Sequence, residues 1–106
     1  MSDMEDLRGR LRAFAAARDW EQFHTPKNLA MALVAEAAEV VEHFQWLTPA
    51  ESATLPAEQR AEVALELADV LLYLVMLADR LDVDLAEAGR RKIAINEARF
   101  PRPARS

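Results

Sequence analysis

The chain has 106 residues, a net charge of −5 and no cysteine. This length allows one domain with one modest core. The acidic balance argues against a general binder of nucleic-acid polymers, whose affinity would rest on a basic face, and the lack of cysteine excludes a disulfide framework and a zinc–thiolate site. A small anionic substrate held through metal ions stays compatible with this composition.

Two segments bear on the cellular location. Residues 1–6 are acidic where a secretory signal needs positive charge. The longest charge-free hydrophobic stretch, residues 70–78, is about half as long as a membrane span. We therefore expect a soluble, cytoplasmic protein without a membrane partner.

Two glycines and long apolar runs at helical spacing predict an all-α protein with four main helices. The first begins near Ser2, where Ser2 and Glu5 fit a capping box, and it ends around residues 20–23. Thr25 caps a second helix over residues 26–46, with Pro26 at its first position.

The second half of the chain contains the other two predicted helices. Thr48 and Glu51 form another capping box, which predicts a helical turn before a third helix over residues 56–81. A fourth helix begins at Asp84 and ends before Pro101. Residues 1–100 are thus expected to form a single domain, followed by a flexible tail over residues 101–106.

The hydrophobic content of 52 % is high for a small monomer. A domain of this size buries only about 60–65 % of its unfolded surface. We therefore predict a homo-oligomer, dimer or tetramer, in which association completes the helical bundle. Phe23 and Phe44 are predicted to fill the core.

Two acidic pairs lie in helical stretches that are otherwise nearly free of charge. Glu36 and Glu39 form the first pair, Glu66 and Asp69 the second. At a spacing of three, both side chains of a pair leave one helix face, with Cβ atoms roughly 5–6 Å apart. No lysine or arginine lies within residues 28–59 to neutralise the first pair. Since like carboxylates repel each other, the pairs indicate a metal site.

The donor atoms of these residues limit the choice of metal ion. Four carboxylates without a required histidine or cysteine suit Mg²⁺, with Mn²⁺ as the alternative. Mg²⁺ is commonly shared between carboxylates and substrate phosphates, which is typical of phosphoryl transfer. The simplest competing interpretation is two solvated helix faces, but such faces normally also contain lysine or arginine.

Two other classes compete with a metal-dependent phosphoryl-transfer enzyme. A carboxylate-bridged di-iron bundle needs two Glu-x-x-His pairs. This chain offers one, Glu21 with His24, because His43 has Val40 at the required position. A purely structural helical module would leave the carboxylate pairs without a purpose, and it predicts that their removal stabilises the fold.

The joint pattern resembles the MazG-type nucleoside triphosphate pyrophosphohydrolases, in particular their dCTP pyrophosphatase branch. Glu36-x-x-Glu39 is followed after 26 residues by Glu66-x-x-Asp69. Ala38 departs from the glycine that many relatives have before the second glutamate. The resemblance covers about residues 12–101, and it also includes Arg18-Asp-Trp-Glu-Gln-Phe-His24, Pro26-Lys-Asn-Leu29, Phe44-Gln-Trp46, Leu71-Leu-Tyr-Leu74 and Lys92-x-x-x-Asn96-x-x-Arg99-Phe100.

This resemblance implies an all-α fold whose active site is completed between subunits. It implies Mg²⁺-dependent cleavage between the α and β phosphates, which yields a nucleoside monophosphate and pyrophosphate. By motif match, the metal ligands are Glu36, Glu39, Glu66 and Asp69. Glu36 is also the candidate catalytic residue that orients the attacking water.

The same resemblance adds candidate nucleotide contacts. Trp20 and Trp46 offer flat faces for a base, and His24 is a base or sugar contact beside Trp20. Lys92, Asn96 and Arg99 share one helix face and are candidate phosphate contacts. The remaining candidates for substrate binding are Lys27 and Asn28, in a first helical turn where N–H groups favour anions, and Tyr73.

Overall fold

The computed structural model describes residues 2–104, and over this range the predicted all-α architecture is confirmed. Residues 101–104 of the expected tail contain no helix or strand, and residues 105–106 lie outside the described range. The elements are α1 (Asp3–Ala17), the 3₁₀ helix η1 (Glu21–Phe23), α2 (Pro26–Glu42), α3 (Pro49–Ala53), α4 (Ala57–Arg80) and α5 (Leu85–Arg99).

Polar caps begin four of these helices where the sequence predicts them. Ser2, Thr25, Thr48 and Asp84 each accept a hydrogen bond from the backbone N–H three residues later. Thr48 and Glu51 form the complete reciprocal box. Side-chain caps satisfy backbone N–H groups that have no partner within the helix, so each start is set locally.

The predicted end of the second helix at Trp46 is wrong, because α2 ends at Glu42. Residues 43–46 form a turn, in which the Phe44 N–H donates to the Val41 carbonyl at 2.9 Å. Such i→i−3 bonds tighten a terminal turn. His, Phe and Trp are also weaker helix formers than the alanine-rich sequence before them.

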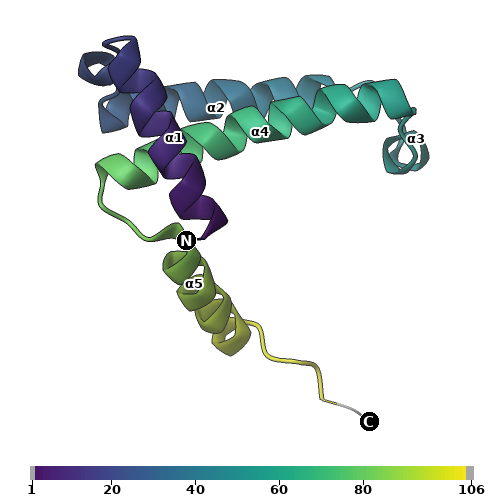
Figure 1. Cartoon of the computed structure of the whole chain (residues 1–106). Helices are drawn as coiled ribbons and strands as arrows, with labels where there is room; N and C mark the ends of the chain where they lie inside the picture. Colours follow the sequence, from purple (N-terminus) through teal and green to yellow (C-terminus); the bar gives the residue numbers. More distant parts are fainter. Residues whose placement is uncertain (1, 105–106) are drawn as a thin grey trace.

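Packing centres on one helix pair. Figure 1 shows α2 and α4 lying side by side in opposite directions, with α1 crossing them and α3 at one end. In contrast, α5 projects away from this pair. Among the described residues, the buried apolar side chains are Ala15, Leu29, Val63, Val75 and Ala78.

This small core corrects the expectation for Phe23. That residue does not fill the core, since it is 59 % exposed, whereas Phe44 is half-buried. On α2, Leu29 is the buried residue. A single chain of this length simply leaves most of its apolar helix surface uncovered.

An apolar stripe on α4 illustrates this surface. Leu67, Leu71 and Leu74 follow the i, i+4, i+7 spacing of one helix face, and all three are exposed. Exposed apolar area of this kind marks interaction surfaces. Within residues 2–104, no helix is both long and apolar enough to cross a membrane.

Two helices end in the same left-handed turn. After α1, Asp19 has φ 55°, and the Trp20 N–H donates to the Ala15 carbonyl. After α4, Asp82 has φ 54°, and the Val83 N–H donates to the Ala78 carbonyl. These are Schellman motifs, which place an apolar residue against the last turn of the helix. The first one sets the position of Trp20.

Candidate metal centre

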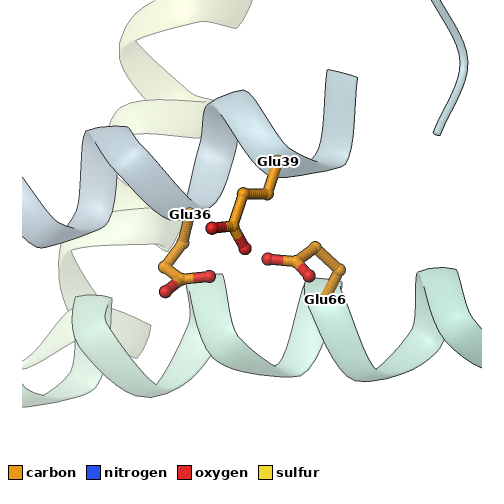
Figure 2. A group of neighbouring side chains, drawn as sticks. All are labelled: Glu36, Glu39 and Glu66. Carbon is orange, nitrogen blue, oxygen red and sulfur yellow. The ribbon is translucent and has the colours of Figure 1, made fainter. Parts of the chain in front are cut away.

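The facing surfaces of α2 and α4 bring three carboxylates together. Glu36 and Glu39 extend from α2, and Glu66 extends from α4 toward them (Figure 2). One carboxylate oxygen from each residue lies within 4.8 Å of the others. Glu36 and Glu66 are half-buried, whereas Glu39 is exposed. The helix pair therefore joins the two sequence motifs into one acidic cluster.

Two oxygen atoms in this cluster lack a partner. Glu36 Oε2 and Glu66 Oε1 are both buried, and no residue of the described chain donates a hydrogen bond to either atom. A buried polar atom without a partner is destabilising. A divalent cation would fit here, because hard oxygen donors at this spacing can share one ion and the ion would satisfy both atoms.

The electrostatics of the cluster support the same interpretation. The pKa of Glu66 is raised from 4.5 to about 8. The largest cause is hydrogen bonding to Glu39, the next is hydrogen bonding to Glu36, and burial and carboxylate repulsion contribute less. Without a cation, a shared proton thus relieves the repulsion. A divalent cation would relieve it more completely and would displace that proton.

Asp69 stands outside this three-residue group. It is exposed and lies one turn after Glu66 on α4. At this spacing it shares the face of Glu66, as the sequence predicts. Its carboxylate does not join the cluster of the other three in this structure.

Trp20 and His24 lie together at the start of α2. Their ring centroids are 6.3 Å apart, and Trp20 also contacts Phe14 edge-on at 5.5 Å. Trp20 is 44 % exposed, so part of its ring is free for a ligand. His24 lines a pocket of about 440 Å³ between α1, η1 and α4.

Lys27 and Asn28 occupy the first turn of α2, as expected. The Asn28 side chain donates to the Phe23 carbonyl at 2.9 Å, and its backbone N–H donates to Thr25. Both groups of Asn28 therefore stabilise the η1–α2 junction in this structure. Lys27 is exposed.

The remaining candidates are spread over the chain. Trp46 is 87 % exposed in the turn after α2, at the end of that helix opposite Trp20. Tyr73 is half-buried on α4. Lys92 and Arg99 are exposed and Asn96 is half-buried on α5, which Figure 1 shows projecting away from the α2–α4 pair. One subunit therefore does not gather all the predicted nucleotide contacts around the cluster.

No motif in the sequence indicates the charged residues of the 440 Å³ pocket. Its walls include Arg8, Arg12, Asp79 and Arg80. Arg12 pairs with Asp79 across 67 positions of sequence. No local spacing predicts such a pair, because the contact depends on how α1 crosses α4.

The architecture and the cluster define a class: helical proteins that hold a metal between carboxylates on facing helices. Comparison with known proteins makes the assignment narrower. The chain matches the MazG-like family over residues 31–105, and it belongs to that family.

Individual relatives agree with this assignment. The chain is 50 % identical over 100 residues to human dCTP pyrophosphatase 1 and 48 % identical over 100 residues to the mouse protein. Each alignment covers 92 % of this chain and 59 % of the relative. The chain therefore spans about three-fifths of the length of these relatives.

A solved structure extends the similarity to the fold. A pyrophosphatase from Archaeoglobus fulgidus superposes with a TM-score of 0.90 at 40 % identity. The match covers 96 % of this chain and 95 % of the archaeal chain. The four-helix MazG-like architecture predicted from the sequence is thereby confirmed.

Proposed function

We propose that this chain is a Mg²⁺-dependent nucleoside triphosphate pyrophosphohydrolase, with dCTP or a modified dCTP as its substrate. It cleaves the α–β phosphoanhydride bond and releases a nucleoside monophosphate and pyrophosphate. The observation that carries this proposal is the cluster of Glu36, Glu39 and Glu66, with its two buried oxygens that lack partners. Similarity to dCTP pyrophosphatase 1 supports the choice of substrate.

In this proposal the four motif carboxylates hold the metal. Asp69 reaches the site from the turn after Glu66 by a change of side-chain rotamer. Mg²⁺ bound there, or Mn²⁺ in its place, would neutralise phosphate charge and acidify a bound water. Glu36 orients the water that attacks the α-phosphorus. The new bond joins the water oxygen to this phosphorus, and the bond to the bridging oxygen breaks as pyrophosphate leaves.

A second subunit completes the site. We infer this from α5, because Lys92, Asn96 and Arg99 lie on a helix that projects away from its own carboxylate cluster. Association through the stripe of Leu67, Leu71 and Leu74 would cover exposed apolar surface. The cations of one subunit then offset the triphosphate charge held at the carboxylates of the other.

The aromatic residues contact the base in this arrangement. Trp20 contacts His24, which lines the pocket, whereas Trp46 is exposed at the opposite end of α2. Trp46 therefore contributes to a base site only from a neighbouring subunit or after movement of its turn. With nucleoside triphosphates as substrates, we expect the protein to act in the cytoplasm.

The first test is turnover on a panel of nucleoside triphosphates, with and without Mg²⁺, with identification of the products. We expect monophosphate and pyrophosphate only with metal, and the fastest rate with a deoxycytidine substrate. Release of diphosphate and phosphate would contradict the α–β cleavage. Absence of turnover on the whole panel would instead support the structural helical module.

Glu39→Gln tests the carboxylate cluster directly. This change removes one negative charge and keeps the shape of the side chain, so we expect loss of Mg²⁺-dependent turnover with unchanged helical circular dichroism. Glu42→Gln is the matched control, because Glu42 is exposed on α2 outside the cluster. Full activity of Glu39→Gln would remove Glu39 from the metal site.

A further inference from the structure

The pocket between α1, η1 and α4 is lined by two chemically different kinds of side chain. The apolar residues include Leu11, Leu29 and Met76. The charged residues include Arg8, Arg12 and Asp79. A binding site for a small heterocycle is typically lined by apolar side chains together with a few polar groups that fix its orientation.

Arg12 and Asp79 form a bidentate pair in this pocket. Arg12 Nε donates to Asp79 Oδ2 at 2.8 Å, and Arg12 Nη2 donates to Asp79 Oδ1 at 2.5 Å. The Asp79 side chain is only 20 % exposed, whereas that of Arg12 is 62 % exposed. The pair uses one lone pair on each carboxylate oxygen, so both oxygens can accept another hydrogen bond.

The charge state of Asp79 makes it a hydrogen-bond acceptor. The hydrogen bonds from Arg12 hold the pKa of Asp79 below its ordinary value, and the positive charges of Arg12, Arg8 and Arg80 act in the same direction. Asp79 is therefore ionised at neutral pH and can accept hydrogen bonds but not donate them. Arg80 donates to the Glu21 carbonyl, which leaves the pairing with Asp79 to Arg12.

The pocket lies along the same helix pair as the carboxylate cluster. Leu29 precedes Glu36 by seven residues, which is about 10 Å along α2. Asp79 follows Glu66 by thirteen residues, which is about 20 Å along α4. A nucleotide with its phosphates at the carboxylates can extend its base along the pair toward this pocket.

We propose that Asp79, held in place by Arg12, determines base specificity by accepting a hydrogen bond from the exocyclic amino group of cytosine. This inference rests on the proposed function and names the group that discriminates between pyrimidines. A carboxylate is a natural acceptor for the cytosine N4 amino group. Uracil and thymine carry a carbonyl oxygen at that position, which would face the Asp79 oxygens acceptor to acceptor.

Asp79→Asn is the direct test. The amide keeps the shape of the side chain, and its NH2 group can donate a hydrogen bond to a carbonyl oxygen at the base edge. We expect the ratio of kcat/KM for dCTP to that for dUTP to fall about tenfold or more, through a loss with dCTP and a gain with dUTP. Asp6→Asn is the control, because it also removes a carboxylate that pairs with an arginine but lies on the exposed face of α1.

A substrate analogue tests the same contact in the unmodified protein. The deoxynucleoside triphosphate of 2-pyrimidinone lacks only the 4-amino group of dCTP. We expect it to have kcat/KM about tenfold below that of dCTP with the wild-type chain, and a smaller difference with Asp79→Asn. This measurement stays decisive even if the variant folds poorly.

The possible results distinguish the role of Asp79 from the proposed hydrolase function. Equal losses on dCTP and dUTP in Asp79→Asn would make Asp79 a purely structural residue and overturn the inference. An unchanged ratio, or equal turnover of dCTP and the analogue by the wild-type chain, would overturn it as well. A wild-type chain that hydrolyses no nucleotide at all would instead reject the proposed function.

Discussion

Glu36 Oε2 and Glu66 Oε1 are buried in the same acidic cluster between α2 and α4, and within residues 2–104 neither atom receives a hydrogen bond. The two residues lie on different helices, so their repulsion acts across the main packing contact of the chain. Without a bound cation or a shared proton, this arrangement therefore opposes the association of α2 with α4.

Glu66→Gln should stabilise the metal-free protein. Above pH 8, where Glu66 is ionised, the amide removes a charge and can donate to Glu39 or Glu36, so we expect the unfolding temperature in EDTA at such a pH to rise by a few degrees. Mg²⁺ should raise the unfolding temperature of the wild-type chain by mass action but not that of the variant. Thermal unfolding with EDTA and with Mg²⁺ checks both effects. Equal Mg²⁺ stabilisation of both proteins would place the metal elsewhere.

The stability of the metal-free protein should depend on pH through Glu66. Its pKa is raised from 4.5 to about 8, so the folded state binds a proton that the unfolded state has lost. The free energy of unfolding should therefore decrease as the pH rises from about 4.5 to about 8. Urea unfolding in EDTA across this range measures the slope.

Glu66→Gln provides the control for this pH dependence. The variant lacks the titrating group, so its slope over the same range should be flatter. Below this range Asp79 acts with the opposite sign. Its pKa is lowered by Arg12, so its contribution to stability is present above its unfolded pKa and is lost as the pH falls through the folded value. A wild-type slope equal to that of the variant would contradict the assigned pKa of Glu66.

Subunit mixing tests whether α5 serves the cluster of a neighbour. One variant carries Glu39→Gln, and the other replaces Lys92, Asn96 and Arg99 by alanine. In a dimer, random mixing of these two inactive variants should restore about a quarter of the wild-type activity, because half of the dimers are mixed and each has one intact site. Activity after dissociation and reassociation is the measurement.

A second mixture gives the control. Glu39→Gln and Glu66→Gln lie in the same cluster, so every site in their mixed dimers has one defect and no activity should return. Failure of the first mixture as well, in verified heterodimers, would show that each subunit uses its own α5.

Trp46→Ala should raise KM more than it lowers kcat. Trp46 is 87 % exposed and therefore contributes little to the core of its own subunit. A base contact is mostly uniform binding of substrate and transition state, which affects KM first. Trp46→Phe retains an aromatic face and should largely preserve KM. An equal loss in kcat and kcat/KM for Trp46→Ala would argue against base contact.

Asp82→Gly should stabilise the fold by about 0.5–1 kcal/mol. Asp82 has φ 54° in the turn after α4, a conformation that glycine adopts without a steric penalty. Asp82→Val should have the opposite effect, because a β-branched residue is strained at positive φ. Chemical denaturation of the two variants compares them. Stabilisation by both changes would mean that the backbone conformation is not what matters there.

Local sequence determined where the helices begin, how the acidic pairs lie and the all-α class of this protein. The caps at Ser2, Thr25, Thr48 and Asp84 were predictable because each depends on one side chain and a backbone N–H three residues away. The acidic pairs were predictable for the same reason, since a spacing of three places both carboxylates on one helix face. The all-α class followed from helical periodicity along the whole chain.

Tertiary structure decided how these local features meet. The packing of α2 against α4 brings Glu66 to Glu36 and Glu39, and the crossing of α1 over α4 pairs Arg12 with Asp79. The tertiary structure also leaves α5 apart from the carboxylate cluster of its own chain (Figure 1). These contacts join residues up to 67 positions apart, and they depend on helix crossings that no short-range spacing specifies.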